Sequence, residues 1–307
     1  MKTNHPLLMY KKRAIANEPL LRYKVNSNEE ASRVQTIDLN NAFDSITKID
    51  THGLYNSFNG CNTTSILSFP KLKTVGKYGM NYAFKNCSNI STISFPKLIS
   101  IDYYGMRVAF ENCIGITNVL FPKLTDVGED ALCFAFQYCT GITSASFPSL
   151  VNISGGAGMQ EIFYGCTNLT SISFPQLSFI SNAGLYRAFS GCGLTTISFP
   201  ELVSVGRNGL YSAFSNCENI TGSIFFPKLA TIGITGLQNA FYNCTGITSV
   251  SFPSLTTIGN NGLSSIFANC TGISSIHFRS DMQAIIESDS GYSSKFGASN
   301  ATIYFDL

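Results

Sequence analysis

Hydrophobic residues along this chain recur in one pattern with a period close to 26 residues. The Phe residues of a repeated Phe-Pro pair are separated by 25 to 27 residues, and a second Phe, often preceded by Ala, recurs in step. The first Phe column comprises Phe43, Phe69, Phe95, Phe121, Phe147, Phe174, Phe199, Phe226, Phe252 and Phe278. Such a repeat is one structural unit that buries its apolar face against its neighbours. The pattern therefore predicts a solenoid of about nine 26-residue coils over residues 42–278.

Each copy of the repeat begins with a segment that predicts a short strand. Ile90, Ile93 and Phe95 are apolar at relative positions 1, 4 and 6, and the last two alternate with a polar residue. This alternation is typical of a strand with one buried face. Pro96 follows at once and ends the ladder, since proline has no N–H to donate.

The rest of each copy predicts a corner and then a short helix. The segment from Leu124 to Gly128 has the form Leu-x-x-Val-Gly, which fits a turn with two inward side chains. Leu185, Ala188 and Phe189 have the i, i+3, i+4 spacing of one helix face. The whole repeat thus predicts an α/β solenoid, a right-handed coil with a parallel β-sheet on one face and short helices on the other.

The two ends of the chain do not follow the repeat. Residues 1–41 are expected to form an N-terminal cap over the first coil or an attachment arm. The attachment candidates in this segment are Tyr10, Lys11, Lys12 and Arg13. Residues 279–307 are expected to form a C-terminal cap, with a helix at 281–287 that begins at Ser280 or Asp281, and a last strand at 301–305 beside Phe278.

Composition and charge exclude several classes of protein. The chain has 307 residues, of which 44% are hydrophobic and 12% charged, so it can bury a large core. Its net charge of +2 gives no reason to expect nucleic acid or an anionic membrane as a partner. No apolar run is long enough to span a membrane, and the first residues lack the form of a secretory signal. We expect an extracellular, cell-surface or virion protein, and a cytoplasmic location stays open.

The cysteines and histidines predict no metal site, cofactor site or catalytic site. Nine of the ten Cys residues follow the second Phe by three positions, and there is no C-x-x-C pair or Cys/His cluster. We expect these nine to be free, buried thiols that act as small apolar residues, although pairing between coils stays open. Cys133 lies outside the column and is expected to be partly exposed. His277 is expected to point outward from its strand, without a carboxylate partner.

The repeat resembles a known family. Ile247-Thr248-Ser249-Val250-Ser251-Phe252-Pro253, the pair Ile232-Gly233, and Ala240-Phe241 with Cys244 are similar to the BspA-like leucine-rich repeat. Relative to that repeat, each copy here has three more residues before Ala-Phe. The resemblance implies a solenoid that recognises or adheres to a partner at the surface of gut or oral microbes, or that occurs in products of their phages. It implies no catalytic residues.

Two surfaces of the predicted solenoid are candidates for binding. Outward positions of the strands and of the corner after Pro are mostly Ser and Thr, and we expect recognition where the copies differ. The candidates on this surface are Lys71, Lys97, Lys123, Ser94, Asn118, Phe225 and His277. A rival surface is the side predicted to be helical, which holds Tyr55, Tyr82, Tyr104, Tyr164, Tyr186, Tyr211 and Tyr242. Tyrosine is common at interfaces, so either surface can bind a protein or a glycan.

The function predicted from these observations is recognition without catalysis. The favoured hypothesis is a protein that binds a protein or glycan on a host or neighbouring surface through one face of the solenoid. The alternative is a structural or receptor-binding component of a phage virion or similar particle, docked through residues 1–41. An enzyme is disfavoured because no set of residues has the spacing of a catalytic site.

Overall fold

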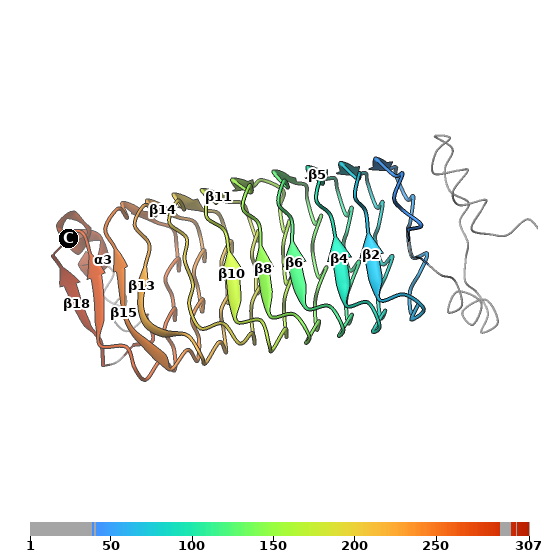
Figure 1. The fold of residues 1–307 in the computed structure, drawn as a ribbon. Helices are drawn as coiled ribbons and strands as arrows, with labels where there is room; N and C mark the ends of the chain where they lie inside the picture. Colours follow the sequence, from blue (N-terminus) through green and yellow to red (C-terminus); the bar gives the residue numbers. More distant parts are fainter. Residues whose placement is uncertain (1–38, 40, 289–295, 299, 307) are drawn as a thin grey trace, which may run out of the picture.

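The structure is a solenoid whose coils stack side by side along one axis (Figure 1). This computed structural model describes residues 39, 41–288, 296–298 and 300–306. All the strand pairs of the stack are parallel. The predicted fold class, a solenoid built on parallel strands, is confirmed, and the predicted helices in each coil are not found.

The first strand of each coil lies where the alternating segment predicts it. These strands, which we call the first ladder, are β2 (Ile66–Ser68), β4 (Thr92–Ser94), β6 (Asn118–Leu120), β8 (Ser144–Ser146), β10 (Ser171–Ser173), β13 (Thr221–Phe225), β15 (Gly246–Phe252) and β17 (Ser275–Phe278). Equivalent residues stand opposite one another, as with Ile172 and Ala145 between β10 and β8. Figure 1 shows β2, β4, β6, β8 and β10 as neighbouring arrows across the stack.

The predicted corner contains a second strand in each coil. These two-residue strands, which we call the second ladder, are β1 (Lys48–Ile49), β3 (Thr74–Val75), β5 (Ser100–Ile101), β7 (Asp126–Val127), β9 (Asn152–Ile153), β11 (Phe179–Ile180), β12 (Ser204–Val205), β14 (Thr231–Ile232) and β16 (Thr257–Ile258). The second residue of the strand points inward, and Val75 and Ile101 are buried. Each regular coil therefore has three sides, which are a first-ladder strand, a second-ladder strand and a longer third segment.

The third side, which we call the turn side, runs from each second-ladder strand to the Cys that follows the second Phe by three residues. In the described coils it contains no α-helix. Its backbone N–H groups alternate between two kinds of acceptor. In one coil, the N–H of Met80 donates to the next coil at Gly105 O (2.6 Å), and that of Ala83 donates three residues back to Met80 O (3.0 Å). Every fourth residue is left-handed, as at Tyr78 (φ 54°) and Tyr82 (φ 57°). The turn side is therefore a run of β-turns that hydrogen-bond from coil to coil.

The helix prediction was wrong for a geometric reason. An α-helix with side chains is ~10 Å across, whereas strands of a sheet are spaced by ~4.8 Å, so a helix in every coil does not fit a straight stack. A turn that repeats every four residues also places Leu, Ala and Phe on one side, as an α-helix of ~3.6 residues per turn does. The apolar pattern alone does not separate the two conformations.

The core consists of aligned columns of identical side chains. Rings of the first Phe column stack between coils, with 5.1 Å between the centroids of Phe69 and Phe95. Rings of the second column also stack, with 5.5 Å between Phe84 and Phe110. The two columns meet edge to face, as Phe95 and Phe110 do at 6.1 Å. Identical neighbours therefore fill the interior from one end of the stack to the other.

One coil departs from the regular pattern. Leu194 follows the ladder cysteine Cys192 by two residues instead of three, and residues 194–199 form no strand. The next coil holds an extra residue, and β13 shifts register against β15 between Gly222 and Ser223. Phe199 lies 6.5 Å from Phe226, farther than other pairs in the column. A one-residue deletion and a nearby insertion thus loosen the first ladder without breaking the stack.

Residues at both ends of the stack bury the last side chains of the core. Leu39, Phe43 and Ile46 are buried at the N-terminal end. At the other end, the 3-10 turn η1 (Ser280–Met282) follows Arg279 and leads into helix α3 (Gln283–Ser288), and the final strand β18 (Thr302–Phe305) pairs in parallel with β17. The predicted boundaries at residues 41 and 279 stay predictions. Within the described ranges, no helix is long and apolar enough to cross a bilayer.

Candidate functional site

The first ladder presents a nearly flat outer surface of small polar side chains. Ser94 is half-buried and Asn118 is exposed, and the Ser144 hydroxyl donates to Asn118 Oδ1 at 2.6 Å. Phe225 is 57% exposed, which makes it the most exposed large apolar side chain of this surface. These candidates thus point outward as predicted, but they lie in different coils and form no shared cluster.

Lys71, Lys97 and Lys123 stand at the corner between the two ladders in three consecutive coils. All three are exposed, and none makes an ion pair in the part of the chain that the structure describes. The equivalent Lys228 instead binds Glu201 at 2.6 Å. A row of like charges is mildly destabilising by itself, so it favours an anionic neighbour.

His277 has neighbours that the sequence interpretation did not give it. Its ring stacks on Tyr304 of β18 at 4.8 Å, and its Nδ1 lies 3.0 Å from Asp306 Oδ1. The expectation of a histidine without a carboxylate partner was therefore wrong, because the partner comes from the C-terminal cap. The four attachment candidates, Tyr10, Lys11, Lys12 and Arg13, lie outside the described residues, and the attachment arm stays a prediction.

The cysteine column is a ladder of hydrogen-bond donors. All ten cysteines are free and buried. Thiols donate to the carbonyl of the second Phe of the preceding coil, as Cys113 Sγ does to Phe84 O at 3.0 Å. Cys133, expected to be partly exposed, is also buried, because it lies between neighbouring coils beside Arg107. Burial raises the pKa of Cys166 and of Cys217 to about 12, so these thiols are protonated and unreactive at neutral pH.

No group of three or more His, Cys, Asp or Glu side chains that could hold a metal ion occurs among the described residues. The pKa values of the buried Cys166 and Cys217 thiols are raised rather than lowered, so these two are not activated nucleophiles. The chemistry that the described surface offers is therefore recognition by stacking, charge and hydrogen bonds.

The turn side of the N-terminal coils holds a cluster of rings and cations. We call this the turn-side cluster, and it comprises His52, Tyr55, Tyr78, Tyr82, Tyr103, Tyr104, Lys77 and Arg107. His52 stacks on Tyr78 at 5.0 Å, and Tyr78 lies 5.2 Å from Tyr104 in the next coil. The Lys77 ammonium lies 4.9 Å from the centroid of the Tyr103 ring. The rings therefore form one continuous aromatic surface across three coils.

At two of these positions the backbone conformation does not favour tyrosine. Tyr78 and Tyr104 are left-handed, with φ of 54° and 55°. Asn adopts this conformation more readily than a bulky residue, and Asn208 and Asn261 occupy the same position in later coils. Tyrosine is thus retained in the N-terminal coils despite a less favourable backbone, which points to a role for the ring itself.

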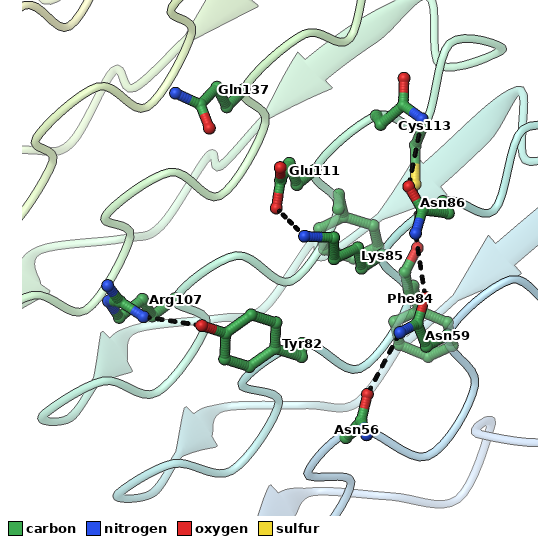
Figure 2. Close-up of polar contacts among 12 residues, drawn as sticks. Asn56, Asn59, Tyr82, Phe84, Lys85, Asn86, Arg107, Glu111, Cys113 and Gln137 are labelled. Carbon is green, nitrogen blue, oxygen red and sulfur yellow. Dashed lines mark hydrogen bonds and ion pairs between the residues drawn. The ribbon is translucent and has the colours of Figure 1, made fainter. Parts of the chain in front are cut away.

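Arg107 lies in the last of the three coils of the turn-side cluster and contacts two of its rings. Its Nη1 donates to the Tyr82 hydroxyl at 3.1 Å, as Figure 2 shows. Its guanidinium carbon lies 5.3 Å from the ring centroids of both Tyr104 and Phe134. Planar guanidinium groups stack well on aromatic faces, so the side chain is held between two rings.

Two buried atoms beside these rings have no hydrogen-bond partner. They are Arg107 Nε and Asn81 Oδ1, at the same position of neighbouring coils. Asn81 is only 3% exposed. An unpaired buried polar atom costs about 1–3 kcal/mol, so this part of the turn side is not optimised for stability.

Asparagines line the adjacent corner and hold the coils in register. Asn86 Nδ2 donates to Asn59 Oδ1 at 3.2 Å, and Asn112 Nδ2 donates to Asn86 Oδ1 at 3.1 Å. Lys85 and Glu111 form an ion pair at 2.7 Å between the same coils. Figure 2 shows these contacts next to Arg107 and Tyr82. They give the turn-side cluster a rigid support.

The turn side of the later coils is built differently. Arg187 lies 4.8 Å from the Tyr164 ring, and Glu161 lies 3.8 Å from its guanidinium. Gln137 Nε2 donates to the same Glu161 carboxylate at 3.0 Å. The positive charge there is thus balanced within the protein, in contrast to Arg107.

The sequence interpretation found part of the turn-side cluster and missed the rest. It named Tyr55, Tyr82 and Tyr104 as a rival surface, but not Lys77 or Arg107. A signal was available for Arg107, since its position holds Asn, Cys, Gln, Tyr or Ser in other coils and Arg in no other.

Comparison with known proteins supports the repeat interpretation. A family model described as a BspA type leucine rich repeat region, with 6 copies, matches residues 54–180, 133–262 and 237–294. A search of curated proteins gave no match.

Among solved structures, the chain is similar to a leucine rich cell surface protein from Faecalibacterium prausnitzii A2-165, with 21% identity over 77% of this chain and a TM-score of 0.39. The chain spans 64% of the length of that protein. The ranges matched by the family model together run from residue 54 to residue 294, most of the 307 residues. The chain therefore belongs to the BspA-type leucine-rich repeat family.

Proposed function

We propose that this protein is a non-enzymatic recognition protein of a microbial cell surface that binds its partner through the turn-side cluster. Membership of the BspA-type family supports a binding or adhesion role, and solenoids of this kind are typically not enzymes. The observation that carries the choice of surface is the set of six rings and two cations in three adjacent coils. Tyr and Arg are the residues most enriched in the energetic centres of interfaces.

Two features distinguish this surface from the first ladder. The aromatic rings are large and contact one another, so little side-chain entropy is lost on binding. The outward Ser and Thr residues of the first ladder are small and offer little area for contact. The residues named on that surface, with Lys71, Lys97 and Lys123 at its corner, remain the competing proposal.

The test uses substitutions that the repeat itself supplies. Tyr78→Asn with Tyr104→Asn places at these left-handed positions the residue found at Asn208 and Asn261, so the fold is expected to be kept. Binding of the full chain to an array of immobilised extracellular-matrix proteins and mucosal glycans is compared with that of the unchanged protein. We expect this double variant to lose about tenfold or more in affinity for the bound array members.

Matched controls separate the surfaces. Tyr186→Ser with Tyr211→Ser removes a stacked pair of the later coils, whose ring centroids lie 5.0 Å apart, and should leave binding unchanged. Replacing the three corner lysines by Ser, as at Ser149 and Ser254, tests the competing surface. Full binding by the Tyr78/Tyr104 variant, together with loss in the lysine variant, would assign recognition to the first-ladder corner instead.

A further inference from the structure

Arg107 carries a positive charge that no acidic side chain of the described residues balances. No acidic side chain lies within ion-pair distance of its guanidinium in the described ranges. Asp130, one coil further on, interacts with the Cys133 thiol and forms no ion pair with Arg107. The other arginine stacked on the turn side, Arg187, has Glu161 at 3.8 Å. Arg187 is thus balanced within the protein, whereas Arg107, like Lys77, has no ion-pair partner among the described residues.

The position of this charge is fixed in advance. One N–H of Arg107 is bonded to the Tyr82 hydroxyl, and the guanidinium plane is held between the rings of Tyr104 and Phe134. Arg has five N–H donors in a rigid fork, so the Tyr82 hydroxyl and the neighbouring Cys133 thiol leave further donors for a ligand. A fork held in this way suits a carboxylate, which accepts two parallel hydrogen bonds.

Two buried polar atoms beside this fork strengthen the inference. Arg107 Nε and Asn81 Oδ1 are unpaired, and the Asn81 side chain is more than nine-tenths buried. Unpaired buried groups in a native protein call for an explanation, and sites of function are one of the common ones. Both atoms are buried, so they indicate a specialised role for this part of the turn side rather than direct ligand contacts.

The rings around Arg107 indicate what kind of molecule bears the carboxylate. The carbon surface of the turn-side cluster comes from phenol and imidazole rings rather than from aliphatic side chains. Flat rings stack on the apolar faces of sugars, and Tyr also offers a hydroxyl to a polar ligand. The rings also recur with the coil spacing of ~4.8 Å, so that they form a row along which an extended chain of sugars can lie. Lys77, over the Tyr103 ring, supplies a second cation one coil away.

We propose that the turn-side cluster binds an acidic glycan, with the carboxylate of one sugar residue on Arg107 and its ring against the neighbouring tyrosines. This inference rests on the function proposed above and narrows its partner to a class. A neutral glycan or an acidic peptide are the outcomes that would count against it. Arg107 and Lys77 select the charge, and the rings select the sugar.

The test compares pairs of probes that differ only in charge. Oligogalacturonate and its methyl ester have the same sugar skeleton, and only the first carries carboxylates. Binding of both to the full chain is measured by calorimetry at two salt concentrations. Sialyllactose with its methyl ester and a glucuronate oligomer with its methyl ester form two further arms, which identify the acidic sugar. We expect at least one acidic member to bind on the order of tenfold to a hundredfold tighter than its neutral partner, as for a charge-assisted hydrogen bond.

Two arginine variants make the test specific. Two later coils have Gln at the position of Arg107, namely Gln160 and Gln238. Arg107→Gln should therefore keep the fold and abolish the preference for the acidic probe. Arg187→Gln removes a guanidinium that also lies over a tyrosine and should leave the preference within about twofold. Thermal unfolding of both variants verifies that the solenoid is intact.

The outcomes separate this inference from the proposed function. If no acidic probe binds better than its neutral partner, or if Arg107→Gln keeps the preference, the acidic-glycan proposal is wrong. Loss of array binding in the Tyr78/Tyr104 variant would then still support recognition by the turn-side cluster. If the array result also fails, the cluster is not the binding surface.

Discussion

The early and late coils of this solenoid have nearly the same interior and very different exteriors. Phe95 stacks on Phe121 at 5.5 Å, and Phe226 stacks on Phe252 at 5.4 Å. Outside, residues 51–137 contain twelve charged side chains, whereas the longer stretch 138–278 contains six. Among the described residues, Lys85 is the only cation of the first stretch with an ion-pair partner, while Arg187 and Lys228 of the second are paired. The packing of the interior is therefore the same in every coil, whereas the exterior varies, and the proposed recognition surface lies where it varies.

The largest expected effect concerns the interior, which both regions share. Burial raises the folded-state pKa of Cys166 and Cys217 to about 12, whereas an unfolded thiol has a pKa of ~8.5. The folded chain keeps these protons while the unfolded chain releases them. The free energy of unfolding should therefore be constant below about pH 8.5 and fall above it, by ~1.4 kcal/mol per pH unit for each such thiol.

Urea unfolding between pH 7 and pH 10 measures this slope. A variant with Cys166→Ala and Cys217→Ala should show a shallower fall than the unchanged protein. Equal slopes in the two proteins would mean that these thiols do not stay protonated in the folded state.

A second prediction compares single Phe side chains of the first Phe column in the two regions. Phe95→Ala and Phe252→Ala should each destabilise the protein by about 3–5 kcal/mol, because each leaves a cavity between stacked rings. The free energies of unfolding should agree within about 1 kcal/mol. A much smaller loss in one region would show that the interior is not equivalent along the stack.

A third prediction concerns the irregular coil, at residues 194–199 inside the second region. The amides of Thr196, Ile197 and Ser198 belong to no strand, whereas those of β15 pair with neighbouring strands on both sides. Hydrogen exchange should therefore be faster at residues 196–198 than at residues 249–251, by roughly tenfold or more, because unpaired amides need no opening. Equal protection would mean that the first ladder continues through this coil in solution.

The smallest effect concerns a surface ion pair of the later coils. Lys228→Ser removes the contact with Glu201 but keeps a residue found at this corner in other coils. Exposed pairs contribute little, so the free energy of unfolding should change by less than ~1 kcal/mol. The same substitution at Lys97, which has no ion-pair partner among the described residues, should be neutral or slightly stabilising. A larger loss at Lys97 would contradict the description of the lysine row as unpaired.

The sequence predicted the interior of this protein well and its third side poorly. Positions such as Val250 and Phe252 follow from the apolar period, and both are buried. The turn side was misread as helical because a four-residue turn period and a 3.6-residue helix period place the same residues inward. The second ladder was missed because two-residue strands are too short to show an alternation.

The contacts of the turn-side cluster and of His277 could not be predicted from the sequence for a related reason. Tyr82 and Arg107 meet across 25 positions of the chain, and their contact depends on the register between two coils. The partner of His277, Asp306, directly follows strand β18, outside the repeat. Contacts between coils follow from the path of the backbone, which the apolar pattern did not determine on the turn side.

The most direct test of the central claim is hydrogen exchange of the full chain with and without the tightest ligand found on the array. The claim is that recognition takes place on the turn side of the early coils. The account predicts added protection at residues 76–107, and none at the equivalent residues 206–238 of the later coils. Protection confined to the later coils, or to the first-ladder strands β4 and β6, would contradict it.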